Sequence, residues 1–198
     1  MHRVRKIDKR VVEMVRIISK KVIQSIATND NYSKDELEQM EYALVTILFE
    51  SIKVISAIVI FSLFGYFKET IIIQVIMFTV KPFIGGYHEE TQTKCLITTM
   101  ISITGILILS LQCNLSFISN CILIFLSIFC IWNQAPVINL KMPITRPELI
   151  KKNRKKGLRN VMLFGIISIV AYNYTSYYLI ITWTILFLAM EMFNKREL

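Results

Sequence analysis

The chain has few of the residues that build metal centres and disulfide frameworks. Its 198 residues include four cysteines and two histidines, and the cysteines form no CxxC pair. Their irregular spacing favours neither a zinc site nor a disulfide framework. We therefore predict no metal ion and no cofactor. Three of the four cysteines are expected to act as small apolar residues of helices: Cys113, Cys121 and Cys130.

Other absences narrow the classes of function. The net charge is +9, yet the chain carries no nucleic-acid-binding motif, so we predict no nucleic-acid partner and assign the charge to a membrane surface. Residues 1–21 hold eight Lys or Arg and no continuous apolar core, so this stretch is not expected to be removed as a signal peptide. The chain also lacks an internal repeat, which disfavours a transporter built from two corresponding halves.

What the chain has in abundance is apolar sequence. Hydrophobic residues make up 54% of it, and its mean hydropathy is +0.53, which predicts an all-α integral membrane protein. Because a spanning helix needs about 20 apolar residues, we expect about six transmembrane helices. The second is the weakest, since its apolar run holds Gln74 and stops at Lys81-Pro82, and it is expected to be short, tilted or re-entrant. The six apolar segments are 43–66, 70–84, 96–112, 115–133, 159–174 and 176–193.

The segment before the first span has a different pattern. Apolar residues at helical spacing, with basic residues between them, predict an amphipathic helix in the membrane interface over residues 1–28; a helix packed on the rest of the protein is the alternative. Ser33 and Glu36 form a capping box that starts the next helix. We thus predict a single polytopic membrane domain over 1–198, with the transmembrane bundle at 33–198. The apolar stripe is Ile7, Val11, Met14, Ile18 and Val22.

The distribution of basic residues predicts the orientation. With six spans and a cytoplasmic N-terminus, the inner segments hold 20 of the 23 Lys and Arg: eight in 1–21, two in 81–94, eight in 141–159 and two after 194. Basic residues favour the cytoplasmic side of short loops, so both termini are expected there. The basic segment 141–159 is interpreted as a topology signal that binds anionic lipid head groups, with recognition of an acidic peptide as the alternative.

One cysteine differs from the others. Cys95 lies at the inner edge of the third apolar segment, seven residues after His88. A thiolate is the reactive form of cysteine, and an imidazole can take the thiol proton and stabilise the charge. Seven residues on one helix would separate the two side chains by about 10 Å, so His88 must lie on a bend before the helix. Gly85 and Gly86 could form this bend and donate amides to an oxyanion.

At these residues the sequence resembles the AgrB family of membrane endopeptidases. The shared features are Gly86-Tyr87-His88 with Cys95, and Lys141-Met-Pro-Ile144 leading into the basic run 151–156. Together with the length and the order of apolar segments, the resemblance covers essentially the whole chain. It implies a bacterial cell-membrane protein, and the predicted orientation puts its active site at the cytoplasmic face.

The resemblance further implies a Cys-His dyad, with Cys95 as nucleophile and His88 as its base. Such an enzyme removes the C-terminal tail of an AgrD-like peptide precursor through a thioester and supports cyclisation of the rest into a thiolactone or lactone for quorum sensing. Two positions depart from the family pattern. Lys81 stands where the family commonly has Arg, which puts a bidentate grip on a carboxylate in doubt, and Glu89 stands where it often has Ala.

Further residues and partners stay open from the sequence. Glu50 and Lys53, at i and i+3 in the first span, are interpreted as a structural pair, with peptide binding as the alternative. Glu89 is interpreted as a solvated loop carboxylate, with orientation of His88 as the alternative. The expected partners are the precursor and membrane lipids, and a homodimer is left open. The competing functions are a small transporter or peptide exporter without peptidase chemistry, and a non-catalytic scaffold.

Overall fold

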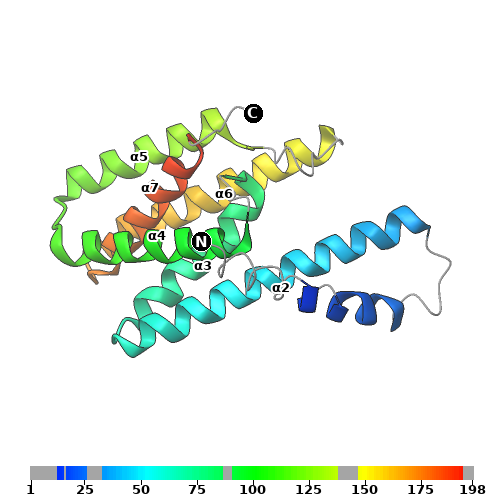
Figure 1. Ribbon diagram of the computed structural model, residues 1–198. Coiled ribbons are helices and arrows are strands. Elements are labelled where there is room, and N and C mark those ends of the chain that lie inside the picture. The colour runs from blue at the N-terminus through cyan, green and yellow to red at the C-terminus, as the bar shows by residue number, and fades with distance from the viewer. Residues whose placement is uncertain (1–12, 16, 26–32, 87–90, 138–146, 194–198) are drawn as a thin grey trace. The chain divides into compact units, whose positions relative to one another are not determined.

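The computed structural model describes residues 13–15, 17–25, 33–86, 91–137 and 147–193. These residues are almost entirely helical and include no strand; a single isolated bridge joins Gly85 and Val137. The all-α prediction is confirmed. Figure 1 shows the labelled helices in chain order, which are α2 (Lys34–Leu63), α3 (Phe67–Ile84), α4 (Gln92–Gln112), α5 (Phe117–Gln134), α6 (Pro147–Ala171) and α7 (Tyr177–Glu191).

Each apolar segment of the sequence falls on one of these helices. By length and composition, three helices in the described residues can cross a membrane: Glu36–Leu63 of α2, α4 and α5. The helix α7 is apolar but shorter, α3 carries Lys68, Glu69 and Lys81, and the first half of α6 is basic. The chain is therefore a helical membrane protein, and the six-span count stays a prediction.

The weak second segment forms a continuous helix. The helix α3 runs for 18 residues with Pro82 inside it and ends at Ile84, so the lysine and proline do not break it. Its buried side chains include Ile73, Ile76 and Val80. These buried apolar side chains make α3 a core helix. Burial of their apolar surface against the neighbouring helices stabilises it.

The chain divides into two compact units, one of residues 1–59 and 89–99 and the other of residues 60–88 and 100–198. This grouping does not test the prediction of one domain over 1–198. In the first unit, a helical stretch at 13–15 and 17–25 lies beside α2 (Figure 1). Its buried face is Val15, Ser19 and Ile23. The described members of the predicted apolar stripe are exposed: Met14, Ile18 and Val22.

This exposed apolar stripe is compatible with an interfacial helix, whose apolar face enters lipid. The buried stripe is displaced by one residue from the predicted one and includes a serine, whose hydroxyl is satisfied by the Val15 carbonyl at 2.9 Å. The capping box is confirmed at the start of α2. The Ser33 amide donates to Glu36 Oε2 at 2.9 Å, and the Glu36 amide donates to Ser33 Oγ at 3.3 Å.

In the second unit, α3, α5, α6 and α7 pack together around apolar side chains and one buried polar cluster. The Thr182 hydroxyl of α7 donates to Asn120 Oδ1 of α5 at 2.6 Å and lies 2.7 Å from the Ser168 hydroxyl of α6. All three residues are buried. Side-chain hydrogen bonds of this kind join helices in a membrane, where apolar surface alone does not drive association.

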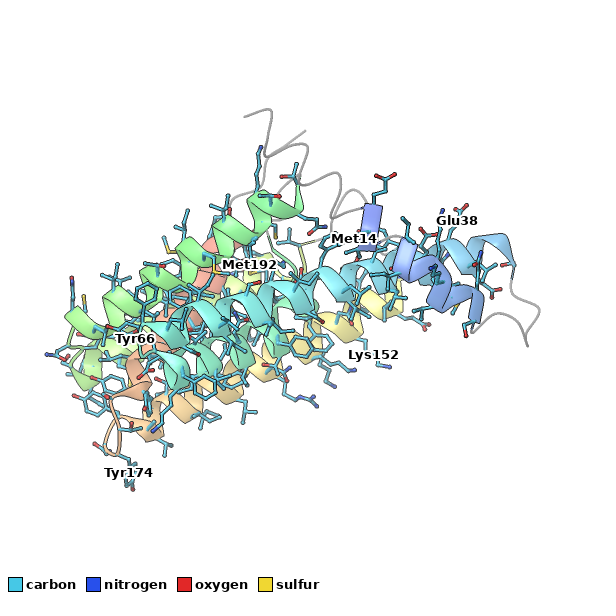
Figure 2. All side chains as sticks on the ribbon, turned by 60° about the horizontal axis from the view of Figure 1, so that its bottom comes forward. Met14, Glu38, Tyr66, Lys152, Tyr174 and Met192 are labelled. Carbon is cyan, nitrogen blue, oxygen red and sulfur yellow. The ribbon has the colours of Figure 1, made fainter. Side chains whose placement is uncertain are left out.

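The two ends of the second unit differ in composition. At one end the Tyr178 hydroxyl donates to the Leu115 carbonyl at 3.1 Å, and the rings of Phe117 and Tyr172 meet edge-on, with centroids 5.3 Å apart. The turns at 113–116 and 172–176 therefore share this end, and they contain no Lys or Arg. Figure 2 shows Tyr66 and Tyr174 toward this end and Lys152 toward the other.

Candidate active site

Cys95 lies in the first turn of α4. The helix begins at Gln92, after His88, as the distance argument requires. Thr91 caps it, because its hydroxyl accepts the Lys94 amide at 3.3 Å and its carbonyl accepts the Cys95 amide at 3.0 Å. Cys95 is half-buried. The sulfur therefore lies near the positive end of the α4 helix dipole.

The side chain that reaches this sulfur in the described residues is Lys53 of α2. Its Nζ donates to Cys95 Sγ at 3.3 Å and to Glu50 Oε1 at 2.5 Å. Lys53 is 8% exposed, whereas the Glu50 side chain is 46% exposed. The predicted pairing of Glu50 with Lys53 is therefore present, but the contact with Cys95 was not predicted.

The other half of the predicted dyad, His88, lies outside the described residues, as does Glu89. The contact between imidazole and sulfur, expected at about 4 to 5 Å because resting sites are often loose, thus stays a prediction. The same holds for the role of Glu89.

The helix α3 ends at Gly85 and Gly86, the two residues predicted to form a bend. Gly85 has φ of 74° and Gly86 has φ of 150°, backbone conformations that favour glycine. The Val137 amide donates to the Ile84 carbonyl at 2.9 Å, and a Cβ on Gly85 would stand 2.1 Å from the Val137 carbonyl oxygen. The Gly85 amide is already bound to the Lys81 carbonyl at 2.9 Å. The Gly85 amide therefore already has an acceptor, and the predicted role of these glycines in binding an oxyanion stays a prediction.

Lys81 has a partner that the sequence did not indicate. Its Nζ lies 2.7 Å from Glu191 Oε2 of α7, an ion pair without the alignment of a hydrogen bond. Both side chains are mostly buried, at 25% and 17% exposed. Glu191 was overlooked because it stands at the end of an apolar helix, where an acidic residue is easily interpreted as solvated. This pairing supports a structural role for Lys81 within its unit.

The sequence of this chain is similar to those of known proteins. The accessory gene regulator B family, AgrB, matches residues 19–194. The chain belongs to this family. It is similar to AgrB-like protein 1 of Clostridium perfringens strain 13, with 40% identity over 89% of this chain and 94% of that protein. An AgrB-like protein of C. perfringens strain SM101 is 28% identical over 80% of this chain and 79% of its own length.

A third relative, AgrB-like protein 2 of strain 13, is 26% identical over 80% of the chain. These relatives are named by their likeness to AgrB and not by an activity. No solved structure matches the chain. Membership of the AgrB family, together with the apolar helices, identifies a membrane protein of an accessory gene regulator system, which serves quorum sensing.

The basic run of this AgrB-family chain is helical. Residues that the sequence suggested were a loop form the first half of α6, where Arg154 donates to the Trp132 carbonyl at 3.0 Å. A groove of about 720 Å³ runs along α6 beside Trp132 of α5, and its mostly apolar lining includes four basic side chains. This combination suits an amphiphile with an anionic head. The groove is lined by Trp132, Lys152, Lys155, Lys156, Leu158, Arg159, Met162, Leu163 and Ile166.

The remaining cysteines show no comparable chemistry. All four cysteines are free thiols, and Cys113, Cys121 and Cys130 are half-buried on apolar helices or their ends. Cys95 is thus distinguished from them by a buried ammonium at its sulfur.

Proposed function

We propose that this chain is a membrane cysteine endopeptidase with Cys95 as nucleophile and His88 as base. It removes the C-terminal tail of an AgrD-like precursor and supports cyclisation of the remaining peptide. The observation that carries the proposal is the position of Cys95, a half-buried thiol in the first turn of α4 with a cationic neighbour, in a chain of the AgrB family.

The reaction proceeds in two acyl transfers. The Cys95 thiolate attacks a peptide carbonyl, and the tetrahedral intermediate expels the amine of the tail, which takes a proton from the His88 imidazolium. The N-terminal part of the precursor is then held as a thioester. An internal Cys or Ser of the precursor gives its proton to His88 and displaces Cys95, which closes the ring. Exchange of a thioester for a thiolactone nearly conserves bond energy, so release of the tail must help to drive the first step.

We place this chemistry at the cytoplasmic face, with six spans and both termini inside. The proposal rests on the 20 basic residues of the inner segments and on the second unit, whose turns at 113–116 and 172–176 share one end and contain no Lys or Arg. Cysteine labelling from outside intact cells should miss residues 81–94 and 141–159; labelling of either segment would contradict it. We also propose two partners: an anionic lipid in the groove along α6 and a second copy of this chain.

The decisive experiment is co-expression with the precursor, followed by mass analysis of the released peptides. Cys95→Ala should abolish cleavage while the protein remains inserted, and Cys95→Ser should be nearly inactive, because a hydroxyl ionises far less readily than a thiol with a free pKa of about 8.5. His88→Ala should fail as well. Cys113→Ala is the matched control and should cleave normally. Tail release by Cys95→Ala would return the chain to the transporter or scaffold classes.

A further inference from the structure

Lys53 is the least accessible charged residue of the Cys95 environment. An ammonium inside a spanning helix is costly unless counter-charges surround it, and Lys53 is 8% exposed. Within the described residues, the groups that act electrostatically on it are Glu50 of its own helix and Cys95 of α4. Glu50 is nearly half exposed, so water solvates part of its carboxylate.

The sulfur is the second acceptor of this ammonium. A lysine ammonium has three donors and no acceptor, whereas a neutral thiol is only a weak acceptor. At 3.3 Å between Nζ and Sγ, the contact is much more favourable if the sulfur is an anion, because opposite charges at this distance attract strongly where water is excluded.

The backbone around Cys95 acts in the same direction. Its place in the first turn of α4, with Thr91 as the cap, puts the positive end of the helix dipole at the sulfur. The dipole comes from α4 and the ammonium from α2, so two independent elements favour negative charge on one atom.

We propose that Lys53 is a catalytic residue, whose ammonium holds Cys95 as a thiolate in the resting protein, and that Glu50 competes with the sulfur for this ammonium. This inference rests on the proposed peptidase function. The thiol proton passes to His88 before the precursor binds, so the resting pair is a thiolate and an imidazolium. His88 gives this proton to the departing amine and then takes one from the ring-closing group. When the ring closes, the carbon–sulfur bond breaks and Lys53 stabilises the departing Cys95 thiolate.

The test measures the sulfur directly and needs no precursor. In a chain with Cys113, Cys121 and Cys130 replaced by alanine, the rate of alkylation of Cys95 by iodoacetamide is followed against pH, and the midpoint of the profile reports formation of the thiolate. Lys53→Met should raise the midpoint by at least about one pH unit, a tenfold slower reaction below both midpoints. Lys53→Arg keeps a charge at the site and should recover most of the shift.

Glu50→Gln provides a second variant with the opposite sign. It leaves the sulfur as the main counter-charge of Lys53, so the midpoint should fall. Misfolding would not shift the midpoints of Lys53→Met and Glu50→Gln in opposite directions. Lys68→Met removes an exposed charge from α3 and is the control that should leave the profile unchanged.

The outcomes separate the inference from the peptidase proposal. The inference is overturned if Lys53→Met leaves the alkylation midpoint unchanged, or if Lys68→Met shifts it by the same amount. This holds whether or not Cys95 cleaves a precursor. A midpoint that rises in Glu50→Gln would also overturn it. Tail release by Cys95→Ala overturns the peptidase function, whatever the alkylation profile shows.

Discussion

Two lysine–glutamate pairs in the described residues differ in what else touches the lysine. Lys81 and Glu191 join α3 to α7 in the second unit, and both are mostly buried. Lys53 and Glu50 are one turn apart on α2 in the first unit, where the carboxylate is nearly half exposed and the ammonium also reaches Cys95.

The difference indicates two uses for a lysine in a membrane helix. Lys81 holds together two helices that are far apart in sequence, and removal of either partner leaves a buried charge. In the part of the chain that the structure describes, Lys53 contacts Glu50 of its own helix and, outside that helix, the Cys95 sulfur. The first pair should therefore determine stability, and the second should determine the reactivity of a thiol.

The largest effect is expected at the backbone junction beside Lys81. Gly85→Ala forces an alanine into a left-handed conformation and places its Cβ against the Val137 carbonyl oxygen. Val137 is held beside Gly85 by the hydrogen bond from its amide to the Ile84 carbonyl, so a shift of Val137 would break that bond. We expect a loss of about 3 kcal/mol or more, or about 6 °C or more in the midpoint of thermal unfolding, measured in detergent.

Gly65→Ala is the matched control for that change. Gly65 also has a positive φ, of 85°, but no atom lies within 4 Å of a Cβ built there, so only the conformational cost of about 1 kcal/mol remains. Equal losses in the two variants would show that contact with Val137 contributes nothing.

Replacement of each lysine tests whether the Lys81–Glu191 pair contributes more to stability than the Lys53–Glu50 pair. Lys81→Met leaves Glu191 mostly buried without a counter-charge and should cost about 2 kcal/mol; addition of Glu191→Gln should restore most of it. Lys53→Met removes a buried ammonium and leaves a carboxylate that is nearly half exposed, so stability should change by less than about 1 kcal/mol. Thermal unfolding of both variants gives the answer. If Lys53→Met were as destabilising as Lys81→Met, Lys53 would have a structural role.

Much of the fold could be predicted from local sequence. Hydropathy located the helices, and Ser33 with Glu36 identified the start of α2, because these signals depend on neighbours in the chain. The start of α6 at Pro147 was missed. Its basic residues suggest a loop on hydropathy, but tertiary contacts hold them in a helix: Gly157 lies so close to Ile84 that a Cβ would stand 2.5 Å from the isoleucine side chain, and Arg154 binds the Trp132 carbonyl.

The candidate site was predictable where it depends on spacing and not where it depends on packing. Seven residues between His88 and Cys95 required a helix that begins after His88, and α4 begins at Gln92. The contact of Lys53 with Cys95 joins residues 42 apart in the chain, and no periodicity relates them. In the same way, the sequence did not indicate that Val15, Ser19 and Ile23 form the buried face of the N-terminal helix, because that face depends on what the helix packs against.

The smallest expected effect concerns the start of the helix that carries Lys53. Ser33→Ala removes the side chain that accepts the Glu36 amide and should cost about 1 kcal/mol. Ser51→Ala is the control, because its hydroxyl only bonds back to the Ile47 carbonyl and its loss should stay within about 0.5 kcal/mol. Since Lys53 lies several turns beyond Ser33, neither variant should move the alkylation profile of Cys95. A shift in Ser33→Ala alone would mean that fraying of α2 reaches the Lys53 contact, and that its geometry depends on the whole helix.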